Sequence, residues 1–185
     1  MTPHWTEKLT RKAACEEAVL WARHYSSFTH AWLACERGDW MLWWVGQTAT
    51  TLSQRRKLVL AACQCARLSL KYVAKGEQRP RQALALAETW ARGGDVTLEE
   101  VRSAASAACA SATCASACAS AASSAAYACA AASDAAYASA SAYAADAAYA
   151  ASASASDAAK TRALALSARI IRKAYPSPPR LKEKP

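Results

Sequence analysis

Apolar residues recur at intervals of three and four along the first half of the chain, a spacing typical of helices that bury one face. This spacing predicts a helix over residues 6–25, which Thr6 can cap, and a shorter helix over residues 28–35. The pattern therefore places two helices before the first glycine of the sequence.

The tripeptide Arg37-Gly38-Asp39 predicts a turn between the second and third helices. Gly38 can adopt a positive φ there, and Asp39 can cap the helix that follows. That third helix carries the tryptophan-rich run of residues 40–45.

A fourth helix is predicted over residues 54–74, with Ser53 as its cap. Its apolar positions form one helical stripe. They are Leu58, Ala61, Ala62, Cys65, Leu68 and Tyr72. Such a stripe predicts packing against neighbouring helices.

Local signals mark the next two helices clearly. Pro80 suits the first turn of a fifth helix, which ends at Gly93-Gly94. Thr97 and Glu100 have the spacing of a capping box and open a sixth helix.

The second half of the chain is a low-complexity region. Residues 103–159 contain 32 Ala and 13 Ser, and no Gly or Pro interrupts the chain from Asp95 to Tyr175. Because alanine has the highest helix propensity, this region is predicted to be helical. A single straight helix of that length would expose almost all of its side chains to solvent. We therefore expect the Ala/Ser-rich region to fold back on itself or to pair with a copy in an oligomer.

The fold expected from these patterns is an all-α helical bundle in three parts. Residues 1–94 form a Trp/Leu-rich helical core, and residues 95–175 form an Ala/Ser/Tyr-rich helical region that packs on it. Residues 176–185 are predicted to be a disordered basic tail, because they combine four prolines with three basic residues.

Charge is unevenly distributed along the chain, which carries a net +9. Residues 160–185 hold eight Lys or Arg against one Glu, whereas residues 103–159 hold three Asp and no basic residue. A basic surface favours anionic partners. The start of the chain has no apolar signal core, and no long apolar run exists, so we expect a cytoplasmic protein with reduced cysteines and no membrane contact.

The sequence offers little support for catalysis. The three histidines form no triad or metal pattern, and there is no glycine-rich phosphate loop. Cys114 and Cys118 could share a helix face, but zinc would need two further ligands. We therefore predict a protein that is not an enzyme and that uses no metal and no cofactor.

Two clusters are candidates for binding a ligand or a partner. The first combines tryptophans with an acid–base pair: Arg37, Asp39, Trp40, Trp43 and Trp44. Because Trp43 and Trp44 are adjacent, they cannot both face the core of one helix, and exposed Trp and Arg are typical interface anchors. The alternative is a tryptophan-filled core between helices.

The second candidate is the run Arg55-Arg56-Lys57, which follows the predicted Ser53 cap. Cations at a helix N-terminus are unfavourable to the helix, so their presence there suggests an anionic partner, although solvent alone could accommodate them. Tyr127 and Tyr137, in repeated Asp/Ser-Ala-Ala-Tyr segments, are further candidates that could instead fill gaps left by alanine.

Three segments carry a resemblance to a known family. They are ACERGDWMLW (34–43), RRKLVLAAC (55–63) and the stretch from Arg79-Pro80-Arg81-Gln82-Ala83 to Glu88-Thr89-Trp90-Ala91. Together with the repeated Asp/Ser-Ala-Ala-Tyr segments, which form an Ala/Tyr/Asp-rich array, they resemble the immunity-protein family, in the immunity-protein-five-like group. The resemblance covers about residues 10–175.

This resemblance implies a non-enzymatic inhibitor that binds and blocks a cognate protein toxin. It also implies an alternative, a phage-type sponge that sequesters an anionic nucleotide immune signal and so inhibits host defence. Binding of nucleic acid through the basic C-terminal segment is a further alternative, which no helix-turn-helix or zinc-finger pattern supports.

Overall fold

The computed structural model describes residues 4–73, 75–109 and 157–180, and every regular element in these ranges is a helix. This confirms the predicted all-α class. The helices are α1 (Glu7–Arg11), α2 (Glu16–Ala22), α3 (Phe28–Ala34), α4 (Gly38–Thr48), α5 (Leu52–Arg67), the 3-10 helix η1 (Leu70–Tyr72), α6 (Arg79–Ala91), α7 (Leu98–Cys109) and α10 (Asp157–Ala174). Most of the Ala/Ser-rich region lies outside the described residues, so its folding back or pairing stays a prediction.

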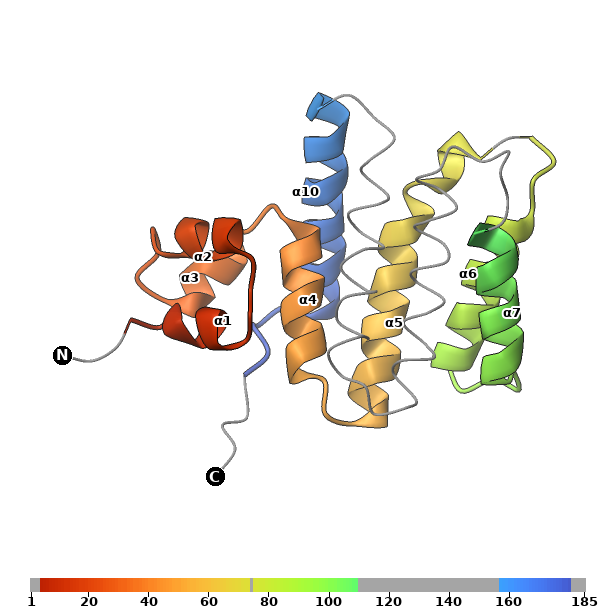
Figure 1. The fold of residues 1–185 in the computed structure, drawn as a ribbon, viewed down its shortest axis with the longest axis horizontal. Coiled ribbons are helices and arrows are strands. Elements are labelled where there is room, and N and C mark those ends of the chain that lie inside the picture. Colours follow the sequence, from red (N-terminus) through yellow and green to blue (C-terminus); the bar gives the residue numbers. More distant parts are fainter. Residues whose placement is uncertain (1–3, 74, 110–156, 181–185) are drawn as a thin grey trace.

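Helix α5 is the centre of the bundle, with α4 and α10 on one side and α6 on the other (Figure 1). The predicted stripe of Leu58, Ala61 and Ala62 is buried, as expected. Val59 and Cys63, which project from other sides of the helix, are fully buried too. Helix α5 is therefore buried over a wide face between neighbours on two sides, whereas Gln54, Lys57 and Gln64 lie on an exposed polar face.

Helix α5 begins two residues earlier than predicted. Thr51, not Ser53, is the N-cap, and its side-chain oxygen accepts a hydrogen bond from the backbone N–H of Gln54 at 3.2 Å. The Gln54 side chain in turn accepts the backbone N–H of Thr51 at 3.1 Å. This reciprocal capping box satisfies two of the orphan N–H groups at the helix start, whereas Ser53 lies inside the first turn.

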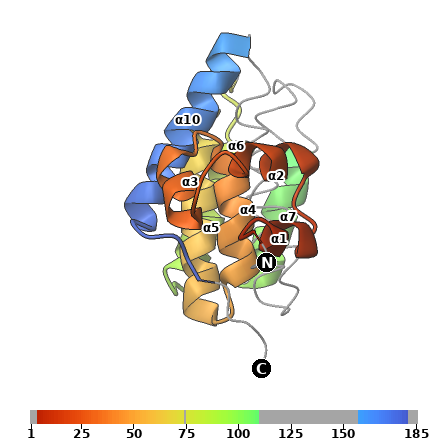
Figure 2. The same cartoon turned by 90° about the vertical axis from the view of Figure 1, so that its left-hand side faces the viewer.

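Helix α10 returns from the far end of the sequence to lie against α4 and α5 (Figure 2). The helices approach closely at Gly38, where a Cβ would lie 2.4 Å from the Cβ of Ser167. Gly38 does not have the predicted positive φ; in the described residues Gly76 and Gly93 do. The glycine at position 38 therefore serves packing against α10, not a turn.

Helices α6 and α7 agree with their local signals. Pro80 occupies the first turn of α6, and Gly93 follows its end with φ of 83°. Thr97 and Glu100 form the predicted capping box: the Glu100 backbone N–H donates to Thr97 Oγ1 at 3.2 Å, and the Thr97 N–H donates to Glu100 Oε2 at 2.7 Å. These hydrogen bonds lower the pKa of the Glu100 carboxyl.

The single helix predicted over residues 6–25 is wrong, because the chain breaks into α1 and α2. Ala13 adopts φ of 58° between them. Its N–H donates to the Thr10 carbonyl at 2.9 Å, and the Ala14 N–H donates to the Leu9 carbonyl at 3.1 Å. This pair of bonds is a Schellman motif, which closes α1 and turns the chain toward α2.

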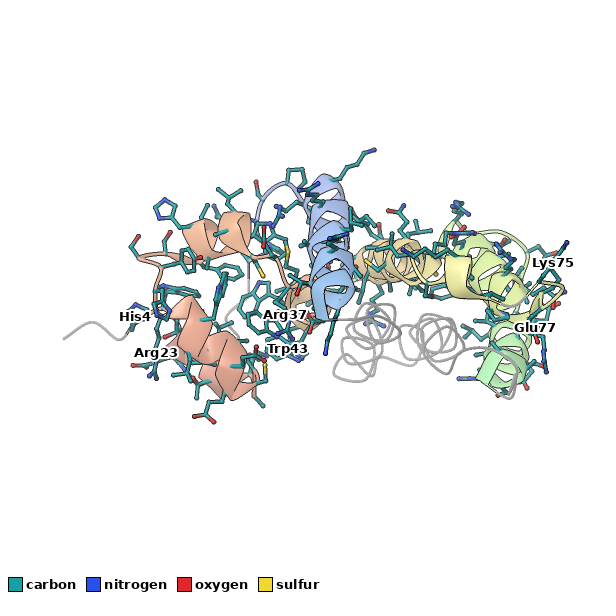
Figure 3. All side chains as sticks on the ribbon, turned by 90° about the horizontal axis from the view of Figure 1, so that it is seen from above. His4, Arg23, Arg37, Trp43, Lys75 and Glu77 are labelled. Atoms are coloured by element: carbon teal, nitrogen blue, oxygen red, sulfur yellow. The ribbon has the colours of Figure 1, made fainter. Side chains whose placement is uncertain are left out.

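Helices α1, α2 and α3 form a small unit beside α4, which we call the N-terminal cap (residues 4–34; Figures 1 and 2). Viewed from above, Arg37 and Trp43 lie where the cap meets α4 and α10, while Lys75 and Glu77 lie at the opposite end of the molecule (Figure 3). None of the described helices has the length and apolarity needed to cross a membrane.

Candidate functional site: a tryptophan-lined pocket

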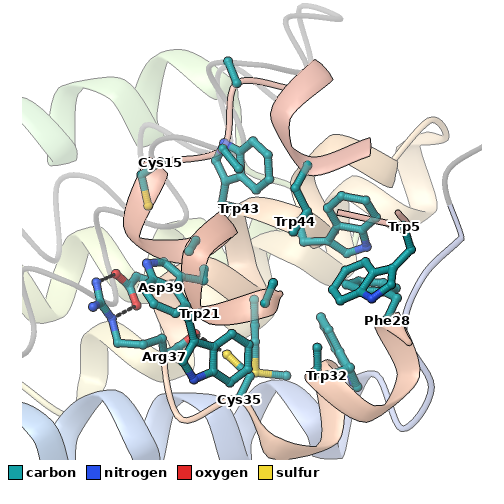
Figure 4. A pocket seen from close by; sticks show the side chains of 18 residues that line it. Trp5, Cys15, Trp21, Phe28, Trp32, Cys35, Arg37, Asp39, Trp43 and Trp44 are labelled. Carbon is teal, nitrogen blue, oxygen red and sulfur yellow. Dashed lines mark hydrogen bonds and ion pairs between the residues drawn. The ribbon is translucent and has the colours of Figure 1, made fainter. Parts of the chain in front are cut away.

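A pocket of about 340 Å³ lies between the N-terminal cap and helix α4 (Figure 4). Six of the seven tryptophans in the sequence and its single phenylalanine line this pocket. The rings are Trp5, Trp21, Phe28, Trp32, Trp40, Trp43 and Trp44. Alanines of the cap, including Ala18, also line the pocket. Because their side chains are short, the space between the rings stays open. We call this site the tryptophan pocket.

Helix α4 supplies one wall through Trp40, Trp43 and Trp44, whose spacing of three and four places them on neighbouring parts of one helix face. Trp44 is 6% exposed, and its ring packs 4.6 Å from that of Phe28, centroid to centroid. Trp43 is only half-buried at the pocket. The two adjacent tryptophans thus differ in role: Trp44 is a core residue, and Trp43 offers its ring to the pocket.

The N-terminal cap supplies the opposite wall through rings that touch one another. Trp5 lies 5.6 Å from Phe28 and donates its indole N–H to the Tyr25 carbonyl at 2.9 Å. Trp21 reaches across to Trp40 on α4, with ring centroids 5.7 Å apart. The sequence analysis did not include these cap rings in the site. In the sequence, Phe28 and Trp32 lie four residues apart, a spacing that indicates helix packing but no site.

Arg37 and Asp39 form an ion pair at the pocket. The Arg37 guanidinium donates to both Asp39 oxygens, at 3.0 and 2.7 Å, and to Glu17 Oε1 at 2.9 Å. These carboxylates raise the pKa of Arg37, chiefly through the hydrogen bonds to Asp39. The guanidinium carbon also lies 4.2 Å from the Trp40 ring centroid, so the cation is stacked as well as paired.

The predicted role of Asp39 as a helix cap is wrong. Arg37 occupies the N-cap position of α4, and Asp39 lies within the first helical turn. There its buried carboxylate binds Arg37 in a bidentate manner. The local sequence thus closes an ion pair over two residues instead of capping the helix, and the pair holds Arg37 against Trp40.

Cys35 lines the pocket but does not carry a reactive thiolate. Burial is the main reason that the pKa of its thiol rises to about 11, and the nearby Asp39 carboxylate raises it further. The thiol donates to the Arg37 carbonyl at 3.5 Å. At neutral pH this cysteine is a protonated, weakly polar wall residue.

The run Arg55-Arg56-Lys57 does not join the tryptophan pocket, and its side chains have separate surroundings. Arg55 is buried and donates to the Thr50 carbonyl at 3.4 Å. Arg56 lies over the Trp90 ring at 5.5 Å, whereas Lys57 lies over the Tyr175 ring at 4.5 Å. Because α5 begins at Leu52, Arg55 ends its first turn, and Arg56 and Lys57 lie in the second. The anion site expected at this helix end stays a prediction.

The remaining candidates, Tyr127 and Tyr137, lie outside the described residues, as do Cys114 and Cys118. Within the described residues, no three His, Cys, Asp or Glu side chains gather as metal ligands would. Neither a family model, nor a curated protein, nor a solved structure matches this chain. The resemblance to the immunity-protein family therefore stays a prediction.

Proposed function

We propose that the protein is a non-enzymatic binding protein that captures a partner protein and blocks it. The tryptophan pocket would enclose an apolar side chain of that partner. The observation that carries this proposal is the pocket wall of seven aromatic rings around about 340 Å³. Aromatic-lined hollows of this kind accept an anchor residue, and such anchors carry most of the binding energy of protein interfaces.

The charges at the pocket favour an apolar anchor over an anionic nucleotide. Among the described residues that line the pocket, Arg37 is the one cation, and it is already bonded to Asp39 and Glu17. A nucleotide would require cations that converge on its phosphates. The cations of the Arg55–Lys57 run are directed to other surroundings.

The same residues support binding without turnover. The described pocket wall contains no histidine, its buried Cys35 is protonated at neutral pH, and Asp39 is engaged by Arg37. General acid–base or nucleophilic chemistry needs a group with a pKa near neutrality or an activated nucleophile. We therefore favour inhibition by occupancy. The immunity-protein resemblance fits this proposal, with a protein toxin as the partner and the cytoplasm as the place of action.

A growth-rescue assay tests the partner class. The protein is co-expressed with a panel of protein toxins, and any rescuing pair is retested with Ala18→Trp, which places a large ring in the pocket. We expect rescue by the wild type and by a matched control, Ala85→Trp, which places the same ring at an exposed position of α6 outside the pocket. Rescue should be lost in Ala18→Trp, with unchanged circular dichroism confirming that the variant folds.

Native mass spectrometry of the protein purified from cells tests the alternative. A clean mass without a bound small molecule is expected for a protein that binds a toxin. Release of an unmodified nucleotide-sized anion on denaturation would contradict the proposal and would favour the sponge. The same spectrum reports the oligomeric state.

A further inference from the structure

The residues that follow α10 accept hydrogen bonds from two tryptophans of the pocket. Trp32 donates its indole N–H to the Tyr175 carbonyl at 3.3 Å, and Trp44 donates its indole N–H to the Pro179 carbonyl at 3.0 Å. Both rings line the pocket, and they are only 2% and 6% exposed. Each indole therefore lines the pocket with its ring and donates its N–H to residues 175–180. We call these residues the C-terminal strap.

Further contacts fix the start of the strap and the end of α3. Arg172 donates to the carbonyls of Trp32, at 3.4 Å, and of Cys35, which belong to the last turn and the C-cap of α3. Helix-end carbonyls lack partners within their own helix, so a guanidinium there ties α3 to α10. Lys57 lies 4.5 Å from the Tyr175 ring centroid and links the strap to α5.

The composition of the strap suits a segment that docks without a large entropic cost. Three of its six residues are prolines, and its last proline contributes the carbonyl that Trp44 binds. Proline fixes φ, so an undocked strap has less freedom to lose than an ordinary segment. The structure thus shows an ordered course for the first half of the tail that the sequence predicted to be disordered.

We infer that the docked C-terminal strap sets the affinity of the tryptophan pocket by fixing the Trp32 and Trp44 rings. This inference rests on the proposed function, because it concerns the regulation of the same site. With the strap docked, the two rings are held open for a ligand. With the strap released, both indole N–H groups lose their hydrogen-bond acceptors. The two rings can then rotate into the pocket, where they would occupy the space that a ligand needs.

Thermodynamic linkage makes this relation reciprocal. If the docked strap favours a ligand in the pocket, a bound ligand must favour the docked strap by the same factor. Any partner that captures residues 175–180 would then release the pocket ligand. The strap would act as a control of binding through residues that do not themselves line the pocket.

The test uses full-length protein and the neutral, environment-sensitive dye Prodan as the pocket probe. Binding is measured by fluorescence titration for the wild type, for Arg172→Gln and for Pro178→Gly/Pro179→Gly. Arg169→Gln is the matched control, because Arg169 is also on α10, three residues earlier, and is exposed. Ala18→Trp identifies dye that binds elsewhere. Cleavage by trypsin after Lys173 reports strap release, since it requires the end of α10 to open.

We expect Prodan to bind about fivefold more weakly to both strap variants than to the wild type or to Arg169→Gln. Saturating Prodan should slow wild-type cleavage after Lys173 by a similar factor. Equal Prodan affinity in wild type and in folded strap variants would overturn the strap inference while leaving the pocket intact. If Prodan does not bind the wild type, or binds Ala18→Trp equally well, the tryptophan pocket is not a binding site. That result would contradict the proposed function and the strap inference together.

Discussion

Ala13 shows how a single residue can break a helix that the surrounding pattern favours. Its left-handed backbone, with φ of 58°, is the C′ position of a Schellman motif, which glycine usually occupies. Alanine in this conformation is strained by about 1 kcal/mol because its Cβ crowds the following carbonyl. The stop signal of α1 is therefore invisible in the sequence, where Ala13 looks like one more helix former.

We expect Ala13→Gly to raise the free energy of unfolding by roughly 0.5–1 kcal/mol, because glycine relieves this strain. Chemical denaturation measures the change. The matched control is Ala85→Gly, at an exposed position within α6, where glycine should lower stability by a similar amount. A loss of stability in Ala13→Gly would show that its left-handed backbone is not a source of strain.

At the scale of elements, capping residues, proline and glycine predicted the helix ends that depend on local sequence alone. The course of α6 and the start of α7 follow from Pro80, Gly93 and the Thr97–Glu100 box, and the structure confirms them. The start of α5 was also present in the sequence. Thr51 has a Gln three residues later, as a capping box requires, whereas Ser53 has Arg56. The residue three positions later therefore distinguishes Thr51 from Ser53 as the cap.

Long-range contacts could not be predicted in the same way. The tryptophans of α4 were identified, because they are concentrated in five residues of sequence. Trp5 and Trp21 were missed, because they reach the pocket only through the way the cap folds against α4. The role of Gly38 also depends on α10, which lies about 130 residues away in sequence. Apolar periodicity specifies the buried face of a helix but not its neighbour.

The contact between α4 and α10 gives a prediction at this scale. A Cβ on Gly38 would lie 2.4 Å from Ser167 Cβ and 2.8 Å from the Ala168 backbone nitrogen. Gly38→Ala should therefore force the helices apart and cost about 2 kcal/mol of unfolding free energy, as overpacking does. Adding Ser167→Gly should recover part of this loss in a double-mutant cycle. Strict additivity of the two changes would contradict a direct contact.

The contact between α5 and α6 is pH-dependent. Burial raises the pKa of the Glu88 carboxyl, but hydrogen bonds and charge from Arg67, at 2.6 Å, and Arg92 outweigh burial, so the pKa lies below its ordinary value. A lowered pKa contributes stability above the unfolded value, and this stability is lost as the pH falls through the folded one. The two arginines are largely exposed, so solvent limits the contribution to about 1 kcal/mol.

We therefore expect Glu88→Gln to lower the free energy of unfolding by about 1 kcal/mol at pH 7. The difference from the wild type should shrink below about pH 4 and disappear once Glu88 is protonated in both states. Denaturation at a series of pH values measures this. Glu99→Gln, at an exposed position, is the control, and a constant difference down to pH 2 would exclude the charged interaction.

At the scale of the whole molecule, the tryptophan pocket and the net positive charge belong to different parts of the chain. Residues 4–44, which include all the residues that line the pocket, contain five basic and five acidic side chains, whereas the charged side chains of residues 45–73 and 160–180 are all basic. The net positive charge of the described residues therefore comes from residues 45–73 and 160–180. In the proposed function, this charge would speed the approach of an acidic partner, and the pocket would supply the lasting contact. The C-terminal strap joins these two regions.

This connection predicts how the molecule unfolds. The cap helices have five, seven and seven residues, too few to be stable alone, so their order depends on contacts with α4, α10 and the strap. Six of the seven tryptophans report on this region, while far-ultraviolet circular dichroism reports on all helices. In the wild type, both signals should change in one transition, because the strap couples the cap to the bundle.

In Arg172→Gln, the tie between α10 and the end of α3 is lost. The tryptophan fluorescence should then change about 5 °C before the circular dichroism, since the cap loosens while the bundle persists. Arg169→Gln should keep the two transitions together. If Arg172→Gln also unfolds in a single transition, the cap is held by its aromatic contacts alone, and the strap has no part in its stability.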